Sequence, residues 1–253
     1  MKKYAVYTGT KNIYEDMEAS AKSLIANSDV DIVHFLIEDN KFPKELPPYI
    51  IQCHNVSNQQ FFNWSGPNMT SKFSYMAMLR IAYAHIFDSD IHMILSLDCD
   101  TFCLDDVSGI WSLFSCDQPY YFSATPEWHK TKSIDSNLMY CNHGVVLYNL
   151  DKMRDGKADE CIDALNCRRY TYVDQDIGNY LCQGHIYPMP PRYNVNYWTC
   201  KNIENETPDP ITIIHYAGVS RENWKKEKIV QDWTDISWED VMSMHTEMVV
   251  KHF

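Results

Sequence analysis

The stretch ILSLDCDTFCLDDV, residues 94–107, places two aspartates directly after an apolar run. The run MILSL, residues 93–97, has the length and composition of a strand buried on both faces, which is typical of a parallel sheet. Side chains at positions i and i+2 of a strand point the same way, so we expect Asp98 and Asp100 to face one point and Cys99 to face away. Two carboxylates in such a place need a cation or hydrogen-bond donors to compensate them. A divalent metal site is one interpretation, and a pair of turn-capping aspartates is the other.

Toward the N-terminus, short apolar runs alternate with residues at helical spacing. Residues 4–8 form an apolar run that ends at Gly9, and the following segment places apolar residues on one helical face. A second apolar run spans residues 32–37, and a second helical pattern runs from Tyr75 to Ile86. Alternating strands and helices predict an α/β fold of Rossmann-like type, with a mainly parallel central sheet flanked by helices.

Toward the C-terminus, the same alternation continues. The pattern predicts a core strand at 144–150, the start of a helix at 174–182, and a late strand at 211–214 that ends at His215. Ligands of open α/β sheets bind outside the carboxyl ends of the strands, so the polar clusters 8–10 and 98–100 and His215 are expected to converge. A capping box at 237–240 predicts a last helix.

Length and composition indicate one domain and narrow the range of partners. A chain of 253 residues with 45% hydrophobic content can form a single domain with a substantial core. The chain has no apolar run of roughly 18 residues, so no transmembrane helix is expected, and its opening residues are too short a run for a secretory signal. Nine cysteines without regular spacing favour free thiols in a reducing compartment, and hence a cytoplasmic location.

The charge of the chain argues against nucleic acid as a partner. A formal net charge of -12 opposes the neutralisation of phosphates that nucleic-acid binding requires. The only dense basic run contains Lys225, Lys226 and Lys228. A solvated surface is the favoured interpretation of this run, and peripheral contact with anionic lipid or with a diphosphate is the alternative.

The string at 94–107 resembles the metal-binding segment of glycosyltransferase family eight, which includes glycogenin and bacterial lipooligosaccharide α-galactosyltransferases. Members of that family typically have an apolar strand, Asp-x-Asp, a Thr with an apolar residue, and a later Asp before an apolar position. Four further segments resemble the family in the same order, and they are MLRIA at 78–82, CNHGVVLYNL at 141–150, DQD at 174–176 and HYAGVSRENW from His215. The resemblance extends from the opening strand to the region of Trp224.

The resemblance implies a single catalytic domain of GT-A type over residues 1–253. Within it, residues 1–110 correspond to a nucleotide-binding half, 111–224 to a half for the donor sugar and the acceptor, and 225–253 to a helical tail. The implied activity is transfer of a hexose, glucose or galactose, from a UDP-sugar to a saccharide, glycan or glycoprotein acceptor. Retention of the anomeric configuration is implied too, and both front-side attack and a covalent intermediate are routes to it.

The resemblance also assigns residues to roles. The implied ligands of Mn²⁺ or Mg²⁺ are Asp98, Asp100 and His215. The implied contacts to the donor nucleotide and its phosphates are Thr8, Gly9, Thr10, Tyr14, Arg80, Asp98, Cys99, Gly218 and Arg221. The residues implied at the reacting sugar are Asn142, Asp174 and Gln175. Carboxylates with one imidazole suit Mn²⁺ or Mg²⁺ better than Zn²⁺, which more often recruits thiolates.

Two departures from the family pattern affect these assignments. The family's Lys-Pro-Trp ending is absent, because Arg221 occupies the spacing of the Lys and Trp224 arrives one residue late. Either Arg221 or Lys225 is then expected to hold the diphosphate. The middle residue of the Asn-x-Gly segment is His143, which is expected to narrow the sugar or acceptor pocket.

Two other functions are compatible with parts of the pattern. A nucleotidyltransferase that joins a sugar phosphate to a nucleoside triphosphate usually needs a Gly-rich, basic loop after the first strand, whereas the loop here is TGTKNIY. A non-catalytic sugar-binding module would not require two carboxylates and a distant His to meet one cation. Aromatic side chains often stack on sugars, and Trp64 and Trp198 are candidates for that contact, although most aromatic residues pack in cores.

Overall fold

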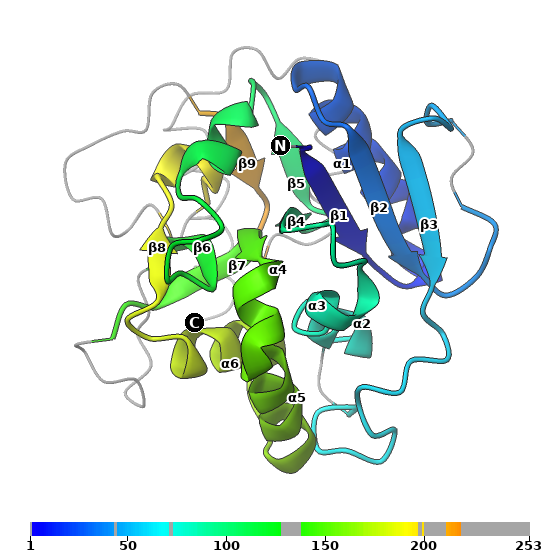
Figure 1. The fold of residues 1–253 in the computed structure, drawn as a ribbon. Coiled ribbons are helices and arrows are strands. Elements are labelled where there is room, and N and C mark those ends of the chain that lie inside the picture. The colour runs from blue at the N-terminus through cyan, green and yellow to red at the C-terminus, as the bar shows by residue number, and fades with distance from the viewer. Residues whose placement is uncertain are drawn as a thin grey trace, which may run out of the picture.

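The computed structural model describes residues 2–42, 45–70, 73–127, 138–196, 199 and 211–218. Its centre is a seven-stranded sheet with the order β3-β2-β1-β4-β7-β6-β8 (Figure 1). The strands are β1 (Tyr4–Thr8), β2 (Ile32–Ile37), β3 (Ile51–Asn55), β4 (Met93–Leu97), β6 (Phe122–Pro126), β7 (Cys141–Asn149) and β8 (Ile186–Pro188). Strands from both halves of the chain share this one sheet, which confirms the prediction of a single α/β domain.

The direction of the strands decides where a site can form. Strands β1, β2, β3 and β4 run parallel to one another, β7 is antiparallel to both β4 and β6, and β8 is parallel to β6. The sheet is therefore mainly parallel, as the sequence predicts. One edge of the sheet collects the carboxyl ends of β1, β2, β4 and β6 together with the amino end of β7. Polar residues that follow or begin these strands come together there.

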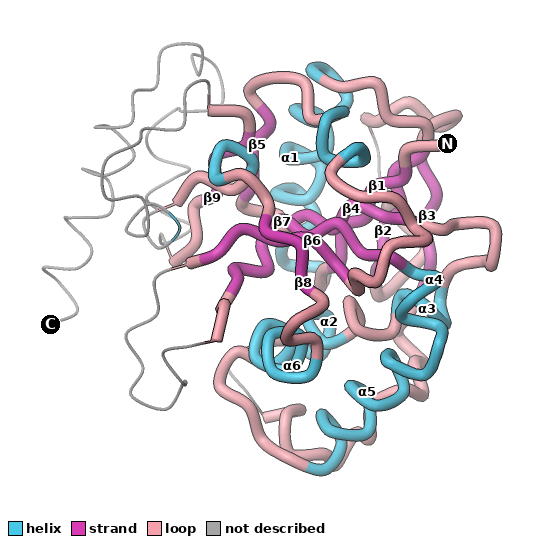
Figure 2. The backbone as a smooth tube through the Cα atoms, turned by 60° about the vertical axis from the view of Figure 1, so that its left-hand side comes forward, coloured by secondary structure: helices cyan, strands magenta, loops and turns pink. Residues whose placement is uncertain are grey.

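Helices cover both faces of the sheet (Figure 2). Helix α1 (Tyr14–Asn27) lies on one face, and α2 (Tyr75–Met78), α3 (Tyr83–Ile86), α5 (Ala158–Cys167) and α6 (Val173–Leu181) lie on the other. Successive strand residues alternate between the two cores: Val146 packs with α2, α5 and α6, whereas Val145 packs with α1. Helix α4 (Leu150–Lys152) and a π-helical turn, Met153–Lys157, connect β7 to α5.

A second, two-stranded sheet carries the end of the described chain. Strand β5 (Thr101–Cys103) pairs antiparallel with β9 (Ile213–His215), and Thr101 lies opposite His215. The expected late strand therefore exists, but it belongs to this small sheet. The described residues also form 3-10 turns at Lys11–Ile13, Ser108–Ser112 and Pro191–Tyr193.

The segment from Tyr75 to Ile86 differs from its prediction. In place of one helix it forms the short helices α2 and α3, and residues 79–82 between them make i→i+3 backbone hydrogen bonds, such as Ile81 N–H to the Met78 carbonyl at 3.0 Å. Apolar side chains at helical spacing do not distinguish this tighter winding from an α-helix. Strands β3, β5, β6 and β8 were not predicted, because each is short or lacks a regular apolar pattern.

Two expectations about the whole chain can be compared with the described residues. The eight cysteines among them are all free thiols, which agrees with the absence of a disulfide framework. Over the same part of the chain, no helix is long and apolar enough to cross a membrane. The helix expected from the capping box at 237–240 lies outside the described residues, as does the basic run at Lys225, Lys226 and Lys228.

Candidate functional site

A tight turn after β4 brings the two aspartates together. Strand β4 ends at Leu97, and the backbone N–H of Thr101 donates to the carbonyl of Asp98 at 3.2 Å, while the Thr101 hydroxyl donates to the same oxygen at 2.7 Å. The carboxylates of Asp98 and Asp100 thus converge because the chain turns, and the strand alternation inferred from the sequence was the wrong reason. Cys99 packs against the apolar core that also contains α1 residues such as Met17.

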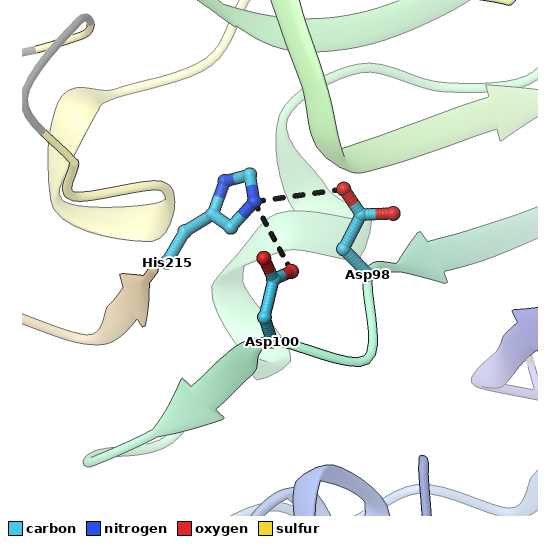
Figure 3. A group of neighbouring side chains, drawn as sticks. All are labelled: Asp98, Asp100 and His215. Atoms are coloured by element: carbon cyan, nitrogen blue, oxygen red, sulfur yellow. Dashed lines mark ion pairs between the residues drawn. The ribbon is translucent and has the colours of Figure 1, made fainter. Parts of the chain in front are cut away.

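His215 faces this acidic pair from the end of β9 (Figure 3). Its Nε2 atom lies 3.5 Å from Oδ2 of Asp98 and 3.3 Å from Oδ1 of Asp100. One ligand atom from each of the three residues lies within 4.8 Å of the others. Asp98, Asp100 and His215 could therefore hold one cation between an imidazole nitrogen and two carboxylate oxygens, and they form a candidate metal centre.

The charges of these groups support a cation at that point. Burial lowers the pKa of His215, but Asp100 and Asp98 outweigh burial and raise it to about 10. In the absence of a cation, the imidazole is therefore protonated and compensates the two carboxylates. Burial raises the pKa of Asp98, but Arg80 and His215 outweigh it and hold that pKa well below its ordinary value. The site thus concentrates negative charge, and a divalent cation could compensate that charge in place of the proton on His215.

Arg80 is the second positive charge of the site. It lies in the tight turn between α2 and α3, where it is only 7% exposed. Its Nη1 donates to the carbonyl of His143 at 2.6 Å and lies 3.7 Å from Oδ2 of Asp174, and its Nη2 pairs with Oδ1 of Asp98. Burial lowers the pKa of Arg80, but Asp98 and Asp174 raise it well above its ordinary value. One guanidinium thus joins the turn after β4 to the start of α6.

The first turn of α6 supplies Asp174 and Gln175. Burial raises the pKa of Asp174 to about 7, and Arg80 opposes that rise. The Oε1 atom of Gln175 accepts from the backbone N–H of His143 at 3.0 Å. Asp176 also lies in this turn, where its Oδ2 accepts from the backbone N–H of Tyr172 at 2.9 Å and so stabilises the start of the helix.

Glu127 is a site residue that the sequence analysis missed. It follows β6 at the same edge of the sheet, and its Oε2 accepts from Nδ2 of Asn142 at 2.8 Å while its Oε1 accepts from Nε2 of Gln175 at 2.9 Å. Burial raises the pKa of Glu127 to about 7, and the hydrogen bonds from Asn142 and Gln175 oppose that rise. An acidic residue directly after a strand is the signal that singled out Asp98, but β6 itself was not recognised.

These residues line one cavity of about 410 Å³. The polar and charged side chains around it are Arg80, Asp98, Asp100, Glu127, Asn142, His143, Asp174, Gln175 and His215, and the other lining residues are Phe73, Ala77, Gly144, Tyr172, Ala217 and Gly218. The cavity is large enough for a small-molecule ligand and combines a candidate metal centre, one guanidinium and two carboxyls of raised pKa. Predicted residues from five segments of the chain, at Arg80, 98–100, Asn142, 174–175 and 215–218, are thus brought together.

The residues predicted at the start of the chain are placed at the same edge but outside this lining. The Thr8 hydroxyl bonds the hydroxyl of Tyr83 at 2.7 Å, and Gly9 packs so closely that a Cβ there would lie 2.6 Å from Cδ1 of Ile13. Thr10 is the N-cap of the first 3-10 turn, and the Tyr14 hydroxyl accepts from the backbone N–H of Glu38 at 2.8 Å. Their role toward a nucleotide stays a prediction.

The remaining candidates divide into described and undescribed residues. Gly218 lines the cavity with φ +79°, a conformation that favours glycine. His143 is buried against Phe122, and a Cβ at Gly178 would lie 2.5 Å from its Cε1. Trp64 is exposed and packs edge-on to Tyr75. Four predicted residues, Arg221, Trp224, Lys225 and Trp198, lie outside the described part of the chain.

Comparisons with known proteins identify the architecture. The fold resembles that of the galactosyltransferase LgtC in complex with donor and acceptor sugar analogues, with a TM-score of 0.67 and 18% identity over 93% of this chain and 98% of that one. It also resembles the glycosyltransferase GlyE of Streptococcus pneumoniae TIGR4, with a TM-score of 0.62 and 18% identity over 99% of this chain and 64% of that one. Mouse xyloside xylosyltransferase 1 gives a TM-score of 0.58 and 15% identity over 85% and 96%. The fold is thus of GT-A type.

A comparison by sequence goes further than the fold. No curated protein matches the chain. The model of a protein family, "Glycosyl transferase family 8", matches residues 5–227, which include every predicted site residue and Glu127. The match covers most of the 253 residues, and the segments that carry it hold the candidate metal centre. The chain therefore belongs to glycosyl transferase family 8 and is a glycosyltransferase.

Proposed function

We propose that the protein transfers a hexose from a UDP-sugar to a hydroxyl group of a saccharide, glycan or glycoprotein, with retention of the anomeric configuration and with a divalent cation. The observation that carries the proposal is the meeting of Asp98, Asp100 and His215 within 4.8 Å in the lining of a cavity that Arg80, Asp174 and Gln175 also line. A sugar-binding module would not need a metal centre beside buried groups of shifted pKa.

The donor set favours Mn²⁺ or Mg²⁺ as the cation. Two carboxylate oxygens and one imidazole nitrogen are hard or borderline ligands, and the thiol of Cys99 is not among the three clustered ligand atoms. A bound divalent cation supplies positive charge that stabilises the departing nucleoside diphosphate. Arg80, which pairs with Asp98, would add a second positive charge beside this leaving group.

The protein groups around the cation would orient the donor sugar. Asp174 and Gln175 lie on the rigid first turn of α6, and Arg80 fixes Asp174 at 3.7 Å. With a pKa of about 7, Asp174 can exchange a proton near neutral pH, and it can accept a hydrogen bond from a sugar hydroxyl in its ionised form. Positioning of this kind is a large part of the catalytic effect in transfer reactions.

Glu127 and Asn142 would form the wall of the cavity that meets the acceptor. Both oxygens of Glu127 already accept one amide N–H each, and each carboxylate oxygen has a further lone pair for a hydroxyl. The retaining reaction has two routes, front-side attack within an ion pair and a covalent intermediate, and the carboxyls in the cavity are compatible with both.

The proposal is tested by incubating the protein with Mn²⁺ and a panel of UDP-sugars without acceptor. Slow hydrolysis of one UDP-hexose is expected, and it should be lost in Asp100→Ala. Asp159→Ala, which removes an exposed carboxylate on α5, is the matched control and should hydrolyse the donor normally. Hydrolysis that persists in Asp100→Ala would refute the metal assignment, and hydrolysis of no member of the panel would refute the UDP-hexose donor.

A further inference from the structure

Behind His215, a chain of side-chain amides runs from the candidate metal centre to the acidic wall of the cavity. The Nδ1 atom of His215 lies 2.9 Å from Oδ1 of Asn194, Nδ2 of Asn194 donates to Oδ1 of Asn142 at 2.9 Å, and Nδ2 of Asn142 donates to Glu127 at 2.8 Å. Asn194 and Asn142 are buried, and His215 is only 3% exposed. Buried hydrogen bonds of this kind are strongly directional and costly to leave unmade.

The direction of every bond in this chain is set by the backbone. A backbone N–H can only donate, and that of Gly144 points at Asn142 at 2.9 Å, so the atom that receives it must be the amide oxygen of Asn142. Asn194, which bonds the same oxygen, must then present its NH₂ group to Asn142. Its own oxygen is consequently on the side of His215, and His215 must carry a proton on Nδ1 to bond it.

Asn196 confirms this direction independently. Its Oδ1 accepts from the backbone N–H of Thr199 at 3.1 Å, so its other terminal atom is the NH₂ group, which donates to Oδ1 of Asn194 at 3.0 Å. The oxygen of Asn194 thus receives two donors, one for each lone pair. The same NH₂ group lies 3.5 Å from Nδ1 of His215. Both atoms are donors in this arrangement, so this contact is not a hydrogen bond, and each of them bonds the oxygen of Asn194 at a shorter distance.

The segment that carries Asn194 is fixed to the strand that carries His215. Val195 forms a parallel bridge with Ile214, in which the Val195 N–H donates to the Ile213 carbonyl and the His215 N–H donates to the Val195 carbonyl, both at 2.9 Å. Asn194 is therefore held beside the imidazole by the backbone as well as by its side chain.

We propose that Asn194 is a positioning residue for the metal centre, which holds the proton of His215 on Nδ1 and so leaves the Nε2 lone pair directed at the site between Asp98 and Asp100. The inference rests on the proposed function only in that a cation occupies this site. Hydrogen bonds from the second nitrogen of a histidine ligand fix its tautomer and ring orientation in metal proteins, and their loss typically weakens metal binding about 10- to 100-fold.

The test compares cation binding in Asn194→Ala, Asn194→Asp and Asn149→Ala. Asn149 is the matched control, because it is also a buried asparagine on β7, but at the end of the strand far from Asn142, where it caps α4. Titration calorimetry with Mn²⁺ and UDP should show Mn²⁺ affinity about 10- to 100-fold weaker in Asn194→Ala. Asn194→Asp, which keeps an oxygen opposite Nδ1, should recover most of that loss, and Asn149→Ala should bind as the wild type does.

A second readout needs no cation. The hydrogen bond to Asn194 should protect the His215 Nδ1 proton from exchange, so NMR spectra of the ¹⁵N-histidine-labelled protein should show its resonance in the wild type and lose it in Asn194→Ala. Mn²⁺ binding in Asn194→Ala as tight as in the wild type, or equal weakening in Asn149→Ala, would overturn the inference. A wild-type protein that shows the proton but binds no cation would instead refute the proposed metal centre.

Discussion

Gly144 lies directly beneath the imidazole of His215, so close that a Cβ at position 144 would overlap Cε1 and Nδ1 of the ring. The imidazole of His215 thus packs directly against the backbone of β7 at Gly144. The same residue donates its N–H to Asn142 and accepts from the N–H of Asp98 at 2.8 Å. A single glycine therefore positions the ring, the amide beside it and the first aspartate of the turn.

Gly144→Ala is expected to displace His215 and to weaken Mn²⁺ binding by at least tenfold, because the backbone under the ring cannot give way. Calorimetric titration of Mn²⁺ measures the effect. Gly156→Ala is the control for general damage: Gly156 has φ +93° and no neighbour within reach of a Cβ, so alanine there should cost about 1 kcal/mol of stability and leave cation affinity unchanged. Equal Mn²⁺ affinity in Gly144→Ala and the wild type would contradict the inference that Gly144 positions His215.

Cation binding is expected to release a proton from His215. Since the two aspartates raise the pKa of His215 to about 10, the imidazole is protonated near neutral pH and must lose that proton before Nε2 can bind a metal. Cation affinity should therefore increase about tenfold per pH unit below pH 10. Calorimetry in buffers of different ionisation enthalpy should count close to one proton released per Mn²⁺ at pH 7.5. His215→Asn should bind more weakly and release none, and a wild-type protein that releases none would contradict this protonation state.

The sequence predicts which residues form the candidate metal centre better than it predicts the turn and the strand pairing that bring them together. The acidic pair after a buried strand and the histidine at the end of a late strand were both recognised, and the three side chains do converge. The turn at Asp98–Asp100 and the pairing of β9 with β5 were not recognised, because a three-residue strand has no periodic signal. The family resemblance supplied what the local pattern could not.

Glu127 and Asn194 show what kind of residue such reasoning misses. Glu127 follows β6, whose sequence FSATP contains a proline and a shift of register after Ala124, so the strand was not recognised and the acid after it carried no signal. Asn194 acts through hydrogen bonds to residues 52 and 21 positions away, and an isolated asparagine gives no pattern by which those partners could be inferred.

Removal of Arg80 is expected to destabilise the fold as well as the site. Arg80→Met leaves the partly buried Asp98 and the buried Asp174 without their shared cation, which should lower the free energy of unfolding by about 3–5 kcal/mol. Urea denaturation without added metal measures that loss. Adding Asp174→Asn should offset part of it, since one of the two uncompensated charges is then gone. Losses that simply add in the double variant would show that the two residues are not coupled.

Glu127 should make the protein less stable as pH rises toward neutrality. Its pKa in the folded protein is raised from 4.5 to about 7, so the folded state holds a proton that the unfolded state releases. This contribution to stability is fully present below pH 4.5 and is lost as pH rises through about 7. Glu127→Gln stays neutral and keeps its one oxygen for either Asn142 or Gln175, while the amide NH₂ of the other residue then faces an NH₂ group. Urea midpoints at pH 5 and pH 7.5 should differ less in Glu127→Gln than in the wild type.

The opposite pH dependence is expected from a histidine pair on the far strands. Nδ1 of His34 on β2 lies 2.9 Å from Nε2 of His54 on β3, and burial, with His54, lowers the pKa of His34 from 6.5 to about 3. The stability that this neutral histidine contributes is present above pH 6.5 and is lost as pH falls toward 3.

His34→Leu should remove that acid sensitivity, because leucine fills the space beside Phe87 without having to accept a proton, and His54 is exposed enough to bond water. In urea denaturation, the loss in free energy of unfolding between pH 7.5 and pH 5 should be about 2 kcal/mol smaller in His34→Leu than in the wild type. His92→Leu is the control, since His92 is half exposed beside Asp151 and its removal should leave the acid sensitivity in place. An unchanged pH dependence in His34→Leu would assign the acid sensitivity to other groups.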